Sequence, residues 1–285
     1  MTTMTKKIAV INDLSGFGRC SLTAAISVLS AMRVQACPLP TAILTAQTGY
    51  PSYYLDDYTD KMEYFRREWA KMGQRFDGIY TGFVAGEEQI HHIFHFIDTF
   101  DTPDTFLLVD PVMGDDGNKY AVFTPNLLRE MKKLARRADI ITPNLTELCL
   151  LTDADYEDIH KINDTEMRIN AIKELADSFQ KNGPEHIIVT GIHLTDKEGT
   201  DLMGNLYISE NASSFSAFPY IGESYSGTGD LFASCIAGGA AKGIPIPEVI
   251  RTAGKFLEAS IADAVRLHIP RNDGVNYEKY LSMLL

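Results

Sequence analysis

The run Gly227-Thr228-Gly229-Asp230 places two glycines and a carboxylate at the point where an apolar, helix-like segment begins. Glycine lets a backbone approach a ligand closely. A helix start offers unpaired N–H groups and a partial positive charge, which together bind phosphate. A carboxylate would repel phosphate, so we expect Asp230 to accept the proton of a hydroxyl. An anion hole beside a base predicts transfer of a phosphoryl group to an alcohol. The alternative is that Asp230 is an ordinary acid in the first turn of a helix. Only the rest of the sequence can distinguish these two interpretations.

Three oxygen donors, Asp110, Asn144 and Glu147, suggest a cation that would accompany such phosphates. No thiol or imidazole stands beside them. Hard oxygen ligands suit Mg²⁺, which binds through one or two carboxylates together with phosphate. Asn144 and Glu147 also have the spacing of a helix cap and a first-turn acid. The two roles are compatible, and the spacing leaves both open.

Short apolar runs alternate with helix-like patterns along the chain, and these elements must position the polar residues. We predict buried strands over residues 8–11, 78–81, 106–110, 139–141 and 186–190. We predict helices over residues 21–32, 60–72, 87–100, 125–137, 164–181, 230–242 and 247–266. Continuous apolar strands separated by helices indicate a parallel sheet covered on both faces. Residues 202–209 and 213–218 indicate an antiparallel pair. The pattern favours one α/β domain over residues 1–285.

Polar segments follow the predicted strands, at the carboxyl ends where such sheets bind their ligands. These segments are residues 12–16, 110–117, 142–147 and 190–191. We expect them to gather at one edge of the sheet, together with the Gly227 turn.

Composition narrows the possible partners and the compartment. The 285 residues are 45% hydrophobic and 22% charged, with a formal net charge of −12. An acidic surface argues against nucleic acid or an anionic membrane as the main partner. No stretch is long and apolar enough to cross a membrane, and the apolar run at residues 8–11 is too short for the core of a signal peptide. The four cysteines lack metal-site spacing, so we expect reduced thiols and a cytoplasmic protein.

The histidines His91, His92 and His95 invite a metal-site interpretation, because positions four apart share one helix face. No carboxylate partner for them is apparent from the sequence pattern. We therefore interpret them as part of an ordinary helix surface.

Four segments together resemble the vitamin kinases of the ribokinase-like superfamily: residues 12–18, 110–114, 142–147 and 227–230. Within that superfamily the pattern is most similar to the pyridoxal (pyridoxine, pyridoxamine) kinases, from residue 8 to about residue 261. The resemblance implies a three-layer fold with a central, mostly parallel sheet and helices on both faces. It also implies ATP- and Mg²⁺-dependent phosphorylation of the 5′-hydroxymethyl group of a B6 vitamer, by a cytoplasmic homodimer. A monovalent cation stays open as a further cofactor.

The resemblance also implies roles for single residues. Asp230 matches the catalytic base, and the N–H groups of Gly227, Thr228 and Gly229 match the anion hole. Asp110 and Glu147 match residues near Mg²⁺ and the ATP phosphates. The implied nucleotide-site residues are Asp110, Thr142, Asn144 and Thr190, with Tyr120 as a lid residue near the γ-phosphate. The implied vitamin-site residues are Asp13, Gln47, Thr48 and Phe83.

Departures from the family pattern leave the identity of the phosphorylated vitamin open. Gln47-Thr48 stands where many relatives have His-Thr, and Phe83 stands where Tyr is common. The segments 13–16 and 45–47 also resemble the sister hydroxymethylpyrimidine kinases of thiamin synthesis. A non-catalytic vitamin-binding protein of the same fold is a third interpretation. It predicts damage to the anion hole or the base, and both are intact in this sequence.

Overall fold

The computed structural model describes residues 5–221 and 224–285. By its internal contacts the chain divides into two compact units. The first takes its residues from Met1–Leu107 and Ile221–Leu285, and the second is Leu108–Tyr220. The single domain over residues 1–285 stays a prediction.

Parallel strands form the centre of the first unit. Strand β1 (Lys7–Ser15) pairs in parallel with β2 (Gln35–Leu44) on one side and with β4 (Gly78–Thr81) on the other. The short strand β3 (Leu55–Asp57) runs antiparallel to β2. The β1 residues from Ile8 to Ile11 are 0% exposed, as expected for a strand that is covered on both faces.

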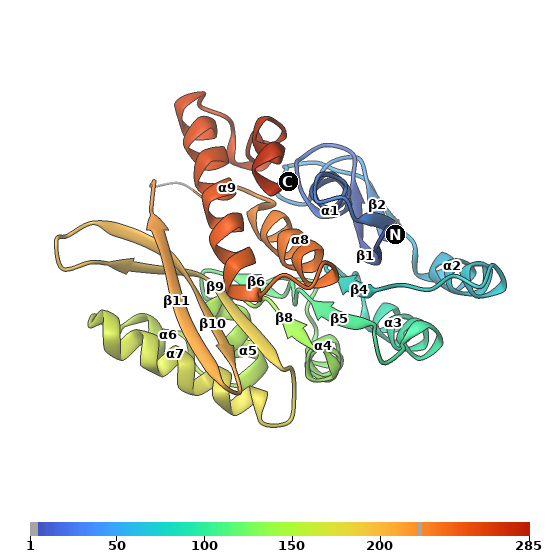
Figure 1. Cartoon of the computed structure of the whole chain (residues 1–285), viewed down its shortest axis with the longest axis horizontal. Coiled ribbons are helices and arrows are strands. Elements are labelled where there is room, and N and C mark those ends of the chain that lie inside the picture. Colours follow the sequence, from blue (N-terminus) through green and yellow to red (C-terminus); the bar gives the residue numbers. More distant parts are fainter. Residues whose placement is uncertain (1–4, 222–223) are drawn as a thin grey trace. The chain divides into compact units, whose positions relative to one another are not determined.

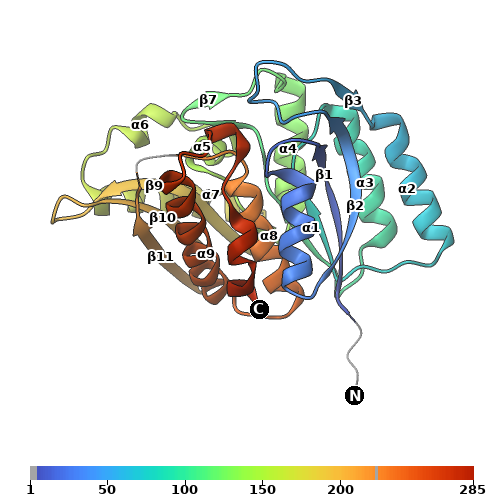
Figure 2. The same cartoon turned by 90° about the horizontal axis from the view of Figure 1, so that it is seen from above.

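Helices cover both faces of these strands (Figures 1 and 2). The bounds are α1 (Ser21–Ala31), α2 (Thr59–Lys71), α3 (Glu87–Phe100), α8 (Thr228–Ala241) and α9 (Ile246–Arg266). In both views α1 and α8 lie on one side of β1 and β2, and α2 and α3 lie on the other. Two 3₁₀ helices, η1 (Arg271–Asp273) and η2 (Tyr277–Leu284), end the chain.

The second unit repeats the mixture of parallel strands and helices. Strands β5 (Phe106–Val109), β8 (Ile140–Ile141) and β9 (His186–Thr195) pair in parallel. Strand β10 (Asp201–Ser209) runs antiparallel to β9 and to β11 (Ala212–Pro219). The helices are α4 (Pro125–Arg137), α5 (Leu145–Thr152), α6 (Tyr156–His160) and α7 (Thr165–Gln180), and a small hairpin joins β6 (Gly114–Asp115) to β7 (Asn118–Lys119).

The expected α/β class with mostly parallel strands is confirmed, and so is the antiparallel pair. Two expectations about strand ends are wrong. Strand β1 continues to Ser15, so Asn12 and Asp13 lie inside the strand rather than after it. Strand β9 continues to Thr195 rather than ending at Thr190, because β10 pairs along its length, so Gly191 lies inside the strand.

None of the helices among the described residues is long and apolar enough to cross a membrane. All four cysteines are free thiols, and Cys37 is the one that is not fully buried.

Candidate active site

The start of α8 has the geometry of an anion site. Gly227 caps the helix with φ +85°, and a Cβ there would collide with the carbonyl oxygen of Arg19, so the position requires glycine. The first hydrogen bond within the helix runs from the N–H of Leu231 to the carbonyl of Gly227. The N–H groups of Thr228 and Gly229 therefore have no partner inside the helix. A Cβ at Gly229 would meet nothing within 4 Å, so the space beside this turn is open.

Asp230 follows in the first turn of α8 and is half-buried. Its Oδ1 accepts a hydrogen bond of 3.2 Å from the amide nitrogen of Asn12, and the backbone N–H of Ser21 is a second partner. Burial raises the pKa of Asp230 to about 6, and the charge of Asp13 adds to this rise, whereas the two hydrogen bonds oppose it. A carboxylate with this pKa is ionised at neutral pH and still basic enough to accept a proton.

Asn12 fixes that arrangement, and sequence reasoning gave it no role. The side chain is fully buried, and its Oδ1 accepts hydrogen bonds from the N–H groups of Phe83 (2.8 Å) and Asp13 (2.9 Å). Two donors on the oxygen leave the amide nitrogen to face Asp230. The glycine at Gly82 makes room for this, because a Cβ there would collide with the amide of Asn12. The available signal was a polar residue inside an otherwise apolar strand.

Asp13 lies on the same strand and is 6% exposed. Its carboxylate accepts hydrogen bonds from the hydroxyl of Ser15 at 2.8 Å and from the hydroxyl of Ser21. Burial raises the pKa of Asp13 despite these bonds. Ser21 contacts both carboxylates, Asp13 through its hydroxyl and Asp230 through its backbone N–H, so the two lie near each other. Its expected contact with a pyridine ring stays a prediction.

Gln47 is buried, and both ends of its side chain are engaged within the protein. Its Oε1 accepts from the N–H of Gly49 (2.7 Å), and its Nε2 donates to the carbonyl of Asn272 (3.1 Å) and the hydroxyl of Ser226 (3.3 Å). Both amide hydrogens are thus used. The geometry favours a residue that shapes the loop after β2. Its neighbour Thr48 is exposed.

Phe83, the fourth predicted vitamin-site residue, is half-buried after β4. Its backbone is fixed on both sides, because its N–H donates to Asn12 and its carbonyl accepts from the hydroxyl of Thr41 at 2.9 Å. Asn12 thus connects the backbones of Asp13 and Phe83 to the carboxylate of Asp230. The contact of Phe83 with a vitamin stays a prediction.

The η1 turn holds together the loops around these residues, and no pattern in the sequence indicates it. The Tyr50 hydroxyl donates to Asp273 Oδ1 at 2.5 Å, and the carbonyl of Asp273 accepts from the N–H of Arg19. The carbonyl of Arg271 accepts from the N–H of Ser226. One short turn thus holds the loop before α1, the loop after β2 and the turn before α8.

The oxygen donors predicted for a cation lie in the second unit. Asn144 caps α5, and its Oδ1 accepts from the N–H of Glu147 at 2.9 Å. Glu147 returns the contact, because its Oε2 accepts from the N–H of Asn144 (2.8 Å) and its Oε1 accepts from the N–H of Met113 (3.0 Å). This reciprocal capping confirms the helix-cap interpretation.

The charges of this group fit a divalent cation. Asp110 and Glu147 are 7% and 5% exposed. Burial and the charge of Asp110 raise the pKa of Glu147 well above its ordinary value, against the opposing effect of its two backbone hydrogen bonds. Thr142 orients Asp110 by donating to its Oδ1 at 2.9 Å. Two buried carboxylates that destabilise each other's charge form an all-oxygen donor set that Mg²⁺ would stabilise.

The remaining nucleotide-site candidates surround this group. Thr190 is half-buried, pairs with Asn144 in an isolated β-bridge and donates its N–H to the carbonyl of Pro143 at 2.9 Å. Tyr120 follows the β6–β7 hairpin and is 42% exposed. The hairpin is anchored by the N–H of Gly117, which donates to the hydroxyl of Thr146 at 2.8 Å.

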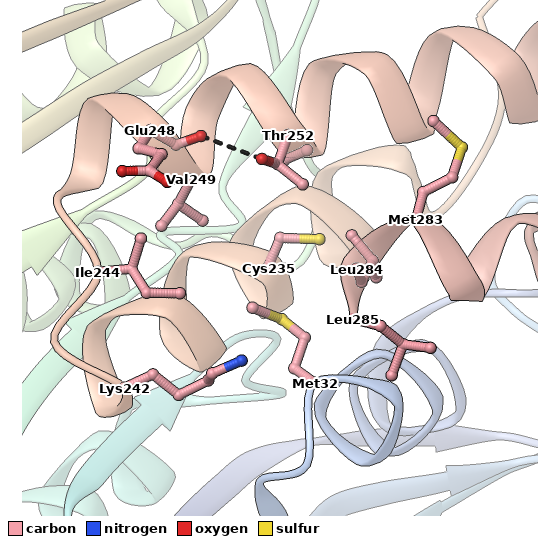
Figure 3. A pocket seen from close by; sticks show the side chains of 11 residues that line it. Met32, Cys235, Lys242, Ile244, Glu248, Val249, Thr252, Met283, Leu284 and Leu285 are labelled. Atoms are coloured by element: carbon pink, nitrogen blue, oxygen red, sulfur yellow. Dashed lines mark hydrogen bonds between the residues drawn. The ribbon is translucent and has the colours of Figure 1, made fainter.

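A separate cavity of about 200 Å³ lies toward the C-terminal end of α8 (Figure 3). Its lining includes Met32, Cys235, Val249 and Leu284, and it contains none of the predicted site residues. It therefore does not belong to the candidate active site.

Three comparisons relate this chain to kinases of the phosphomethylpyrimidine and pyridoxal type. The profile of the phosphomethylpyrimidine kinase family matches residues 17–274. A candidate phosphomethylpyrimidine kinase from Bacteroides thetaiotaomicron, crystallised with pyridoxal, is 36% identical, with a TM-score of 0.86 over 98% of this chain and 96% of that one. Pyridoxal kinase from Lactobacillus plantarum is 26% identical, with a TM-score of 0.84 over 99% of this chain and 97% of that one.

A candidate pyridoxal kinase of Schizosaccharomyces pombe is 31% identical over 56% of this chain, and the match spans 45% of the fission yeast protein's own length. Together the similarities confirm the ribokinase-like fold and a kinase of the pyridoxal or hydroxymethylpyrimidine type. The chain belongs to the phosphomethylpyrimidine kinase family.

Proposed function

We propose that this chain is a pyridoxal kinase, which transfers the γ-phosphoryl group of ATP to the 5′-hydroxymethyl group of pyridoxal, pyridoxine or pyridoxamine. The observation that carries the proposal is the carboxylate of Asp230, held by Asn12 at the open N-terminus of α8. A base and an anion site in one helical turn are the two groups that phosphoryl transfer to an alcohol requires.

In the proposed reaction the vitamin's hydroxyl donates a hydrogen bond to Asp230. As the oxygen attacks the γ-phosphorus, its O–H bond breaks and the proton passes to Asp230. The new O–P bond forms while the bond to the bridging oxygen of ADP breaks. The N–H groups of Thr228 and Gly229 stabilise the charge that develops on the transferring phosphoryl. Asn12 keeps the carboxylate oriented throughout.

We assign the cation to the second unit, where Asp110 and Glu147 would hold Mg²⁺ together with the nucleotide phosphates. When bound, the cation neutralises phosphate charge. The hydroxyl of Thr142 orients the carboxylate of Asp110 for this role, and the backbone N–H of Asn144 orients the carboxylate of Glu147. Thr190 and Tyr120 complete the proposed nucleotide site. A homodimer and a cytoplasmic location belong to the proposal as well, and a monovalent cation stays open as a further cofactor.

The proposal of a B6 vitamer as the substrate is supported by a related protein. The Bacteroides thetaiotaomicron protein, 36% identical over nearly the whole chain, was crystallised with pyridoxal. The second candidate is hydroxymethylpyrimidine kinase, favoured by the family profile and by the motif at residues 13–16. A non-catalytic vitamin-binding protein is disfavoured, because the base and the helix start are both well formed.

Competition between substrates tests the proposal. Purified protein with ATP and Mg²⁺ receives equal concentrations of pyridoxal, pyridoxamine and hydroxymethylpyrimidine. We expect the higher kcat/KM for a B6 vitamer. A higher kcat/KM for the pyrimidine would assign the chain to thiamin synthesis, and no ATP consumption with any of them would favour the binding protein.

A further inference from the structure

Helices α2 and α3 lie side by side in the first unit (Figures 1 and 2) and bring three potential metal ligands together. Glu63 comes from α2, and His92 and His95 come from α3. One ligand atom from each of the three lies within 4.8 Å of the others. The carboxylate of this group comes from the neighbouring helix α2, and the packing of the two helices brings it to the histidines.

His92 gives an independent reason to suspect a ligand. Its Nδ1 is buried and has no hydrogen-bond partner among the described residues. A buried ring nitrogen without a partner is unfavourable, and a metal bound through Nδ1 would satisfy it. His95, one turn further along the same helix face, is exposed, so the cluster is open to solvent.

Glu63 is an ionised and well-oriented ligand. Arg66 donates to both of its oxygens, and Arg67 donates through Nε to Oε1 at 2.8 Å. These contacts, the Arg66 hydrogen bond first, lower the pKa of Glu63 to about 2. Ligating carboxylates are commonly held by such outer hydrogen bonds. The guanidinium charges also compete with a cation, and a metal bound at Oε1 would have to displace the exposed Arg67 from that oxygen.

We propose that Glu63, His92 and His95 form a site for a divalent transition metal of the Zn²⁺ class, with water in the remaining position. Two imidazoles and one carboxylate suit Zn²⁺ and Co²⁺, whereas Mg²⁺ prefers oxygen donors alone. The site is thereby distinct in chemistry from the Asp110 and Glu147 pair. Because its ligands come from two helices, a bound metal would link α2 to α3.

The test measures Zn²⁺ binding to chelator-treated full-length protein by calorimetry, with Mg²⁺ in excess so that oxygen-only sites are occupied. We expect one equivalent of Zn²⁺ that Mg²⁺ does not displace. His95→Asn should weaken binding by about tenfold or more, and the double variant His92→Gln with His95→Asn should abolish it. The matched control is His91→Asn, which changes the neighbouring histidine of the same helix and should bind like wild type.

Two further measurements distinguish the proposed histidine site from Zn²⁺ binding at a cysteine or at scattered surface groups. Zn²⁺ should raise the unfolding temperature of wild type and of His91→Asn, but not that of the double variant. Co²⁺ should give the absorption of a tetrahedral complex without a thiolate band. Binding that survives in the double variant, a thiolate band, or no binding to wild type would each overturn the proposal. None of these results bears on the kinase proposal, whose residues are different.

Discussion

The amide nitrogen of Asn12 donates a 3.2 Å hydrogen bond to the carboxylate of Asp230. This contact joins a buried strand, β1, to the first turn of α8. It orients the carboxylate at a place where burial makes ionisation unfavourable. The function proposed for Asp230 therefore comes at a cost in stability, and that cost depends on pH.

Asp230→Asn should stabilise the protein at alkaline pH. The pKa of Asp230, about 6 in the folded state, lies above the value of about 3.9 expected in the unfolded chain. The contribution of this residue to the free energy of unfolding is thus most favourable below pH 4 and is lost as pH rises through 6. Asn cannot ionise, so the variant should be more stable at pH 8, by up to about 3 kcal/mol, and nearly equal at pH 4. Urea unfolding at both pH values checks this, and a gap of the same size at both would refute it.

Gly229→Ala should fold and yet lose activity. A Cβ at Gly229 meets no protein atom within 4 Å, and alanine favours helix. The methyl group would instead stand where the phosphoryl group is proposed to approach. We expect unchanged or higher thermal stability and a kcat lowered by about tenfold or more. Gly227→Ala is the contrast: its φ of +85° and its contact with Arg19 should destabilise the fold itself. Full activity in folded Gly229→Ala would remove the anion hole from the account.

Glu147→Gln should increase the Mg²⁺ concentration that gives half-maximal rate. The change removes one of two mutually repelling buried carboxylates and so weakens the oxygen donor set. It also places an amide nitrogen against a backbone N–H, which should cost roughly 1 kcal/mol of stability. Initial rates across a Mg²⁺ titration measure the first effect. A titration curve that coincides with wild type would show that Glu147 serves only to cap α5.

Tyr50→Phe should raise the KM for pyridoxal by a larger factor than the KM for ATP. The substitution removes the 2.5 Å hydrogen bond to Asp273 and so loosens the η1 turn that holds the loop after β2. A loss of about 1 kcal/mol corresponds to roughly a fivefold rise in KM. Steady-state kinetics in both substrates makes the comparison. Equal rises in both KM values would indicate a general structural defect instead.

The apolar pattern predicted much of the fold. Helices α3 and α4 have the expected bounds, because each carries an apolar face between clear start and stop signals. Strand β2 was missed because Pro38 and Pro40 interrupt it. Both prolines lie in the part of β2 that pairs with β1 and precedes the stretch that pairs with β3. The missing N–H groups are tolerated there, because that part of β2 has no β3 partner on its other side. The η1 turn has no periodic pattern of apolar residues from which it could be predicted, and it is recognised only by its tertiary contacts.

The site was predictable where chemistry is local in sequence. The Gly227 to Asp230 run indicates a helix start and an acidic residue within four positions, and the structure has both. The surroundings of Gln47, and the group of Glu63, His92 and His95, depend on residues that are distant from each other in the chain. For Gln47 these are Ser226 and Asn272, which occupy its amide. No spacing rule could have indicated those partners, because they meet only after the elements pack.

The turnover of Asp230→Asn tests whether Asp230 is the general base. Asn keeps the size of the side chain and can still accept from Asn12, so the variant should fold and bind pyridoxal and ATP with little change. Without a general base, kcat should fall by about 10²–10⁴-fold. Single-turnover phosphorylation of pyridoxal, with binding of both substrates measured separately, gives the answer. Turnover within a few-fold of wild type would contradict the assignment of Asp230 as the base.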